Sequence, residues 1–407
     1  MTDAQPTPRR GLSRRELLLG GGGAGAGLAA GAIAGWALAG TRPDAPGDPA
    51  PGANAPEPAA PDDAAPASVE PYGAHQAGIA RPTTPQRNAL VLVADIPGDP
   101  DRDAVLAMLA AVGEVTARAT DAEHPDPALT PDGAGDLTIT IGIGPRLVRA
   151  VDATLPGAEQ LPAFASDTHL TPAATGGDLL VSVCASDASA VHAAATAVVE
   201  AAGGRMRWSQ QGVRGAGEGM VARNPLGYHD GVIVPHDEAE YDEGVWIGSG
   251  PASGGTLLVI RRLQLDVAAF RALGDAAGDR VIGRERVSGA PLSGGVLADP
   301  ADLTAKTPEG EYLVPLRSHV RAAHPSFTGS PLMLRRGYSY RNGDGADAEE
   351  GLLFMCYQNS LDTFVRTQRR LDETDDLMGY VRCTASASFL ILPGRASAAE
   401  PLGAALA

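Results

Sequence analysis

Strand-like and helix-like patterns of apolar residues alternate along the chain from about residue 88. Compact or alternating apolar runs, each short enough to be a strand, occupy residues 89–96, 136–143, 179–184 and 204–210. Helical spacing of apolar residues occupies residues 103–119 and 188–202. The resulting order, strand–helix–strand–strand–helix–strand, is that of a ferredoxin-like unit, in which helices cover an antiparallel sheet.

The second half of the chain repeats this plan. Strand-like runs return at residues 255–265, 351–357 and 388–392, and helical spacing at 266–274 and 361–371. We therefore expect an α+β fold with two ferredoxin-like domains, one over residues 87–235 and one over 236–397. Residues 283–341 have little periodicity and are rich in Gly, Pro, Arg and His, so we expect a loop-lined site there.

The first 39 residues have the features of an export signal. Residues 13–18 read Ser-Arg-Arg-Glu-Leu-Leu, an uncharged stretch follows over 17–40, and Ala-Leu-Ala at 37–39 offers a cleavage site. This pattern resembles a twin-arginine signal, and it predicts export to the cell envelope or the extracellular space by the twin-arginine machinery. An uncleaved membrane helix is the alternative, because the stretch is long enough to span a bilayer.

Composition adds three constraints. Residues 40–86 are rich in Pro and Ala, which predicts a disordered tether. The net charge of -17 argues against a nucleic-acid partner. The three cysteines, Cys184, Cys356 and Cys383, lack CxxC and CxxCH spacing, so the sequence supports neither a zinc knuckle nor a redox dithiol nor covalently attached c-type haem.

A set of motifs in a fixed order occupies the region from residue 72 to 394. The strongest are GYHDG at residues 227–231, which fits GxxDG, SHVR at 318–321, and LRRGYSY at 334–340. With these motifs the chain resembles the dye-decolourising peroxidase family, in particular its twin-arginine-exported branch. The resemblance implies one haem b per chain, held in the C-terminal domain, and an enzyme that reduces hydrogen peroxide and oxidises organic donors such as dyes or phenols.

The resemblance also implies roles for three residues. His319 would be the proximal ligand of the haem iron, for which imidazole is a common donor. Asp230 would move a proton between the peroxide oxygens, although the residues alone favour an ordinary Asp-Gly turn. Arg335 would stabilise developing negative charge. Because neighbouring side chains of an extended run point in opposite directions, only one of Arg335 and Arg336 can face the haem, and the family pattern favours Arg335.

Two further assignments are weaker. A proximal histidine usually donates its second ring nitrogen to a carboxylate, and Asp362 is a candidate for that partner. An acid that stabilises a helix N-terminus is an equal alternative for Asp362. Arg284 is a candidate partner of the haem propionates.

The chain departs from the family's Asp-Gly-Thr-x-Asn-Pro pattern at residues 230–235, which read DGVIVP. A hydroxyl and an amide near the haem edge are therefore lost. Trp246, Tyr338 and Tyr340 could pass electrons from bulky donors to the haem, with core packing as the main alternative for each.

A second function class fits the same residues. Exported relatives of this family are associated with iron uptake, so the alternative is a haem-binding, iron-acquisition protein that releases iron from haem. The same pocket would serve both activities, and the sequence does not separate them. A ferredoxin-like module without haem would require His319, Asp230 and Arg335 all to be coincidental. The oligomeric state stays open.

Overall fold

The computed structural model describes residues 67–345 and 348–407, which belong to one compact unit. The predicted signal over 1–39 and the tether up to residue 66 lie outside the described residues. Within the described ranges, no helix has the length and apolar character needed to cross a membrane.

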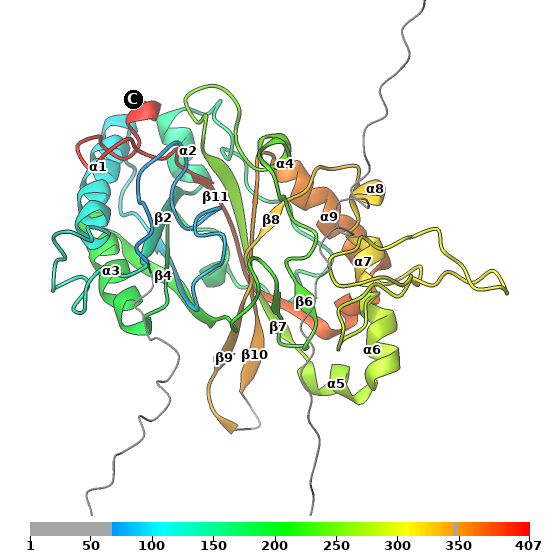
Figure 1. Cartoon of the computed structure of the whole chain (residues 1–407). Coiled ribbons are helices and arrows are strands. Elements are labelled where there is room, and N and C mark those ends of the chain that lie inside the picture. The colour runs from blue at the N-terminus through cyan, green and yellow to red at the C-terminus, as the bar shows by residue number, and fades with distance from the viewer. Residues whose placement is uncertain (1–66, 346–347) are drawn as a thin grey trace, which may run out of the picture. The chain divides into compact units, whose positions relative to one another are not determined.

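The N-terminal half forms a four-stranded antiparallel sheet in the order β2-β3-β1-β4. Its strands are β1 (Asn88–Asp95), β2 (Thr138–Ile143), β3 (Leu179–Ala185) and β4 (Arg205–Val213). Its helices are α1 (Arg102–Ala119), α2 (Pro145–Val151) and α3 (Ala188–Ala201). Asp101 and Asp187 cap α1 and α3 by accepting hydrogen bonds from backbone N–H groups of the first turn. These helices cover one face of the sheet (Figure 1).

The C-terminal half repeats the arrangement with the strand order β11-β7-β10-β9, again antiparallel. Its strands are β7 (Thr256–Leu265), β9 (Tyr338–Asn342), β10 (Glu349–Gln358) and β11 (Val381–Ile391), with the short β8 (Leu334–Arg335) beside β10. Helix α9 (Leu361–Thr374) connects β10 to β11. The predicted α+β fold with two ferredoxin-like sheets is confirmed.

The two sheets join at both edges. Strand β11 pairs with β2, and β4 pairs with β9 through Val213 and Ser339, so the eight long strands form a closed ring. Apolar side chains from both halves fill its interior, among them Val91, Leu258 and Phe389. The two halves share one continuous sheet, so the sheet itself does not mark a boundary between domains. The predicted division at residue 235 therefore stays a prediction.

Short elements gather beside the C-terminal half, mostly on one side of the molecule (Figure 1). They are β5 (Ala222–Arg223), β6 (His229–Asp230), α4 (Glu238–Gly244), α5 (Val267–Ala272), α6 (Asp275–Ile282), α7 (His319–Ala322) and α8 (Pro325–Thr328). Three 3-10 helices complete the described part of the chain: η1 (Pro172–Ala174), η3 (Asp376–Tyr380) and η4 (Ala404–Leu406). Elements this short have too few turns to leave a periodic signal, which is why the sequence pattern missed most of them.

The segment before β1 corrects the predicted tether. The Gln76 amide donates hydrogen bonds to the carbonyls of Ile141 and Leu392, both at 2.9 Å, and Ile79 is buried. The Gln86 side chain donates to the carbonyl of Asp136 at 2.8 Å. The tether therefore does not extend to residue 86 as predicted, because its last part carries amide and apolar side chains that pack on the sheet.

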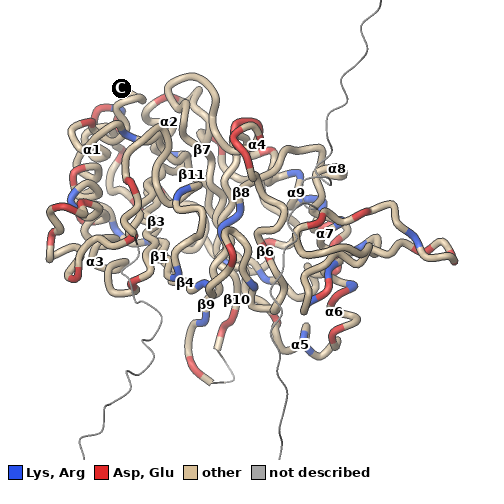
Figure 2. The backbone as a smooth tube through the Cα atoms, viewed as in Figure 1, with Lys and Arg blue, Asp and Glu red and all other residues tan. Residues whose placement is uncertain are grey.

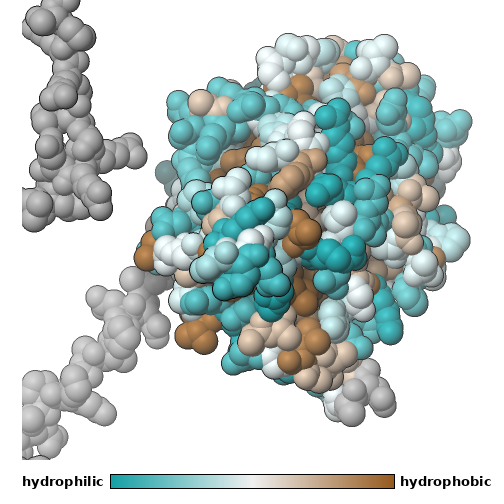
Figure 3. All heavy atoms as spheres, turned by 90° about the vertical axis from the view of Figure 1, so that its right-hand side faces the viewer, coloured by the Kyte–Doolittle hydropathy of each residue, from teal (hydrophilic) through white to brown (hydrophobic). Residues whose placement is uncertain are grey.

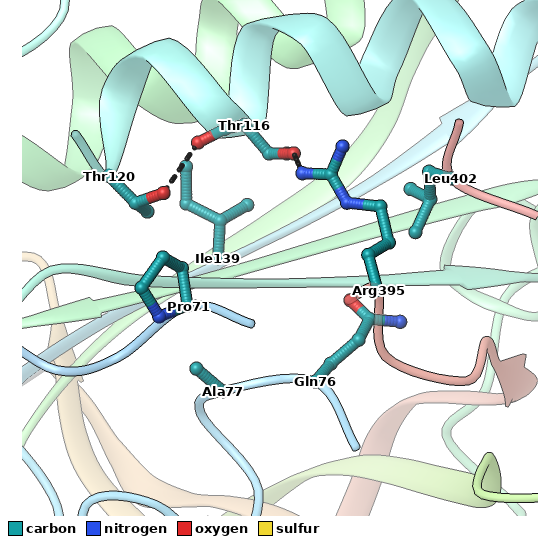
Figure 4. Close-up of a pocket in the computed structure, with 8 residues that line it drawn as sticks. All are labelled: Pro71, Gln76, Ala77, Thr116, Thr120, Ile139, Arg395 and Leu402. Carbon is teal, nitrogen blue, oxygen red and sulfur yellow. Dashed lines mark hydrogen bonds between the residues drawn. The ribbon is translucent and has the colours of Figure 1, made fainter. Parts of the chain in front are cut away.

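The C-terminal segment packs against α1. Arg395 reaches from this segment to the Thr116 hydroxyl at 3.1 Å, beside a pocket of about 30 Å³ that Gln76 and Leu402 also line (Figure 4). This volume has room for only one or two water molecules. None of the predicted site residues lines it, so the functional site lies elsewhere.

Candidate active site

His319 is the first residue of α7 and has one ring nitrogen engaged. Its Nδ1 lies 2.6 Å from Oδ2 of Asp375. Because a carboxylate oxygen accepts, Nδ1 carries the hydrogen and donates it. The lone pair is then on Nε2, which has no hydrogen-bond partner among the described residues. The ring is thus oriented with one nitrogen available to a ligand.

Asp375 holds this ring from a fixed position. It ends α9 and begins η3, its side chain is fully buried, and its Oδ1 accepts a hydrogen bond from the backbone N–H of Leu377 at 2.9 Å. Burial alone would lower the pKa of His319, but the charge and hydrogen bond of Asp375 outweigh it and raise that pKa above its ordinary value.

The predicted partner Asp362 does not contact His319. It is exposed in the first turn of α9 and pairs with Arg366 one helical turn later, at 2.5 Å. Asp375 lies at the opposite end of this helix, about 20 Å away for 14 residues. Asp362 therefore fits the alternative reading, an acid at a helix N-terminus, and Asp375 replaces it as the partner of His319.

Asp230 lies in the short strand β6, which pairs with β5 opposite Ala222. The backbone turns sharply after it. Gly231 has φ +85°, and a Cβ there would collide with the carbonyl oxygen of Met220, so only glycine fits. The Gly231 N–H donates to Asp230 Oδ1 at 2.6 Å. Asp230 Oδ2 accepts no hydrogen bond from the described residues, which leaves it available to a substrate.

Arg335 completes a pair with Asp230. Its Nη2 donates to Asp230 Oδ1 at 3.1 Å, and its Nη1 donates to the carbonyl of Ile233 at 2.9 Å. Arg336 points the other way, as expected for its neighbour in a strand. It is fully buried and donates to the Ile79 carbonyl at 2.5 Å and to Gln86 Oε1 at 3.2 Å.

The electrostatics of Asp230 connect it with His319. Burial alone would raise the pKa of Asp230, but the nearby Arg335 charge and the Gly231 hydrogen bond outweigh it, with a further contribution from His319. The pKa of Asp230 is therefore below its ordinary value, and the carboxylate is ionised at neutral pH. Since Asp230 in turn helps to raise the pKa of His319, the two side chains lie within electrostatic reach of each other.

These three side chains are only partly buried. The exposed fractions are 38% for His319, 29% for Asp230 and 26% for Arg335. Leu352 and Phe354, on the outward face of β10, are only half-buried although β10 lies between two neighbouring strands. Leu352 lies near Asp230, because both side chains come within 4 Å of the position that a Cβ on Gly337 would take, whereas Phe354 packs against Phe364.

The altered loop after Gly231 is packed as apolar structure. Val232 and Val234 are buried, and Val234 belongs to the cluster inside the strand ring. The backbone carbonyl of Ile233 instead serves Arg335. Apolar side chains that pack in the core thus stand where the family pattern has a hydroxyl and an amide. Arg335 still has a hydrogen-bond acceptor in this loop, the Ile233 carbonyl.

The three aromatic candidates for electron transfer are buried members of the same apolar cluster. Trp246 stacks on His75 with ring centres 3.7 Å apart. The Tyr338 hydroxyl donates to Cys184 Sγ at 3.6 Å, and that of Tyr340 to Glu349 at 2.6 Å. This arrangement favours the packing alternative for each of them.

Arg284 is buried and holds its own loop together. It donates to the backbone carbonyls of Gly289, Leu297 and Asp299 at 2.8 to 2.9 Å. Burial lowers its pKa. The predicted contact with haem propionates therefore gains no support from the geometry, since these donors are already occupied.

Comparisons with known proteins identify the family of this chain. The family models "Dyp-type peroxidase, N-terminal" and "Dyp-type peroxidase, C-terminal" match residues 76–214 and 221–396. The chain is 36% identical over 334 residues to the dye-decolorizing peroxidase of Thermobifida fusca, covering 75% of this chain and 77% of that protein. It is 31% identical over 375 residues to the deferrochelatase of Shigella boydii, covering 82% and 86%.

A solved structure shares the fold. The oxyferrous complex of DtpA from Streptomyces lividans has 31% sequence identity and a TM-score of 0.76, covering 84% of this chain and 98% of that chain. The chain therefore belongs to the Dyp-type peroxidase family. The family and the enzyme class expected from the sequence are confirmed.

Proposed function

We propose that this peroxidase binds one haem b per chain through His319, reduces hydrogen peroxide with Asp230 and Arg335, and oxidises organic donors such as phenols or dyes. The observation that supports this most strongly is the His319 ring. Its Nδ1 is held by the buried Asp375, its Nε2 has no hydrogen-bond partner among the described residues, and it lies within electrostatic reach of the ionised Asp230 and Arg335 pair.

The residues at the site fit haem. A neutral imidazole with a carboxylate behind it is a suitable axial ligand for haem iron. A porphyrin also needs apolar contacts, and the half-buried Leu352 offers one near Asp230. Haem as the cofactor agrees with the oxyferrous state of the DtpA structure.

When bound, haem supplies the iron centre at which peroxide is reduced. Asp230 Oδ2 accepts a proton from one peroxide oxygen and returns it to the other, since no hydrogen bond from the described part of the chain reaches this oxygen. Arg335 donates to Asp230 Oδ1 and is held in place by the Ile233 carbonyl, so its fixed positive charge stabilises negative charge as the oxygen–oxygen bond breaks. Asp375 keeps the His319 ring in one tautomer and one orientation.

Release of iron from haem is the second candidate, because a relative of similar coverage is a deferrochelatase. We expect haem-loaded protein that is given hydrogen peroxide and guaiacol to oxidise guaiacol while its porphyrin keeps the iron. Absorbance of the guaiacol product and fluorescence of metal-free porphyrin measure the two outcomes in one sample. Metal-free porphyrin without guaiacol oxidation would favour iron release instead.

We also propose that the twin-arginine machinery exports the chain to the cell envelope or beyond. The support is the motif at residues 13–18 and the uncharged stretch after it. Replacing the pair at 14 and 15 by lysine (R14K with R15K) should retain the protein in the cytoplasmic fraction of expressing cells. The matched control replaces the arginines at 9 and 10 (R9K with R10K) and should leave export unchanged. Equal export of both variants would refute this route.

A further inference from the structure

A groove of about 460 Å³ opens beside α6, outside the site described above. Its walls come from α6, from the loop after Arg284 and from Leu313. It lies on the side of the molecule that carries α5 to α8 (Figure 1) and that faces the viewer in Figure 3. The volume is in the range of small-molecule sites.

The rim of this groove is partly apolar. Val287, Leu292 and Leu313 line it, and Val287 is one of the most exposed large apolar side chains among the described residues. Brown hydrophobic spheres interrupt the hydrophilic surface at several places on this face (Figure 3). Exposed apolar residues around a concavity are a feature of ligand-binding surfaces.

The charges around the groove largely offset one another. Asp275 pairs with Arg286 at 2.6 Å, and Arg280 is exposed on α6. Both red and blue segments lie on and near α6 (Figure 2). Glu285 is exposed, and within residues 67–345 and 348–407 its carboxylate accepts a hydrogen bond only from Ser288, at 2.5 Å. A groove with both acidic and basic side chains around it suits a neutral ligand. The Glu285 carboxylate can still accept a further hydrogen bond.

The groove shares a wall with the turn that carries Asp230. The Tyr228 hydroxyl donates to Asp279 Oδ1 at 2.7 Å, and the backbone N–H of Arg286 donates to the same oxygen at 3.0 Å. Asp279 and Arg286 both line the groove. Tyr228 and Asp230 are two residues apart in the GxxDG turn, so the wall of the groove is hydrogen-bonded to the segment that positions Asp230.

We infer that this groove binds the phenolic electron donor, an inference that rests on the proposed peroxidase function. The aromatic ring lies on Val287, Leu292 and Leu313, and the hydroxyl donates to Glu285. Each phenol gives up one electron and one proton, with Glu285 accepting the proton. Two phenols reduce one hydrogen peroxide, whose oxygen–oxygen bond breaks, and two water molecules and two phenoxyl radicals result.

Filling the groove tests this inference. Ala276 lines the groove and is exposed on α6, so A276W should occupy it without disturbing the fold. We expect the KM for guaiacol to rise about tenfold in haem-loaded A276W, from loss of apolar contact, with kcat less affected. The exposed Ala272 at the end of α5 does not line the groove, and A272W is the matched control, with an unchanged KM.

Binding without peroxide separates this inference from the proposed function. Line broadening of guaiacol proton resonances by wild-type holoprotein should be lost in A276W and kept in A272W. E285Q, which preserves the shape of the side chain, should raise the KM about threefold and covers the case in which A276W does not fold. A KM and a line width unchanged by both groove variants would overturn the inference. If wild-type holoprotein failed to react with peroxide, the proposed function would fall, while the broadening would still decide whether the groove binds phenols.

Discussion

D230N is expected to slow the reaction of the haem-loaded protein with hydrogen peroxide by about two to four orders of magnitude. The amide oxygen of asparagine can still accept the hydrogen bonds of Gly231 and Arg335, so the turn should keep its geometry. The amide cannot, however, take up and return a proton. Stopped-flow absorbance in the Soret region, with peroxide in excess and no donor, measures this rate directly.

The control for this variant is D242N, because Asp242 is an exposed residue of α4 away from the turn. Its rate should equal that of the wild type. If D230N reacted as fast as D242N, Asp230 could not be the proton relay.

The pH dependence follows from the lowered pKa of Asp230. The carboxylate is the active form, so the wild-type rate should hold from neutral pH downward and fall only below pH 3.8, the ordinary pKa of an aspartate. R335L removes the cation that counteracts burial, so the pKa rises and the decline should move to higher pH. If the peroxide rate of R335L fell at the same pH as that of the wild type, Arg335 would not control the pKa of Asp230.

D375N is expected to weaken haem affinity or peroxide reactivity about 10- to 100-fold. The asparagine can offer its NH₂ or its carbonyl to His319, but it removes the negative charge that polarises the ring. Titration of haem into apoprotein measures the affinity. The iron–histidine stretching frequency in resonance Raman spectra of the ferrous protein should fall, and a purely structural role for Asp375 would not produce that shift.

The exposed Asp362 provides the matched control. D362N removes a surface ion pair with Arg366 and should leave both haem affinity and the stretching frequency unchanged. H319A should show the largest loss of haem affinity, since it removes the proposed iron ligand itself. If D375N and D362N behaved alike, the hydrogen bond between Asp375 and His319 would have no functional role.

The strand and helix patterns predicted the fold because long elements leave a clear period. Helix α1 was expected at 103–119 and spans Arg102–Ala119, and β7 was expected at 255–265 and spans Thr256–Leu265. The pattern could not predict the closure of the two sheets into one ring. That closure depends on only a few pairs between β11 and β2 and between β4 and β9, which no local period encodes.

The polar residues of the site were predictable to different degrees. Alternation along an extended run separated Arg335 from Arg336, and the structure places them on opposite sides. The partner of His319 was not predictable, because Asp362 and Asp375 lie at opposite ends of one helix and only the packing of α7 against the far end selects between them. The one available signal was an acid at a helix C-terminus, where the macrodipole disfavours it.

The contacts of Arg336 have a consequence for maturation of the protein. Its guanidinium joins the backbone at Ile79 and the side chain of Gln86 to the strand that carries Arg335. The segment that contains Ile79 and Gln86 thus holds the strand of Arg335, the proposed catalytic arginine. If the proposed export signal is cleaved, a cut between Ile79 and Gln86 would remove these contacts, so we expect cleavage upstream of Ile79. A recombinant protein that begins at β1 would lack the contacts of Arg336 with Ile79 and Gln86, and it should not be used in place of the full globular part.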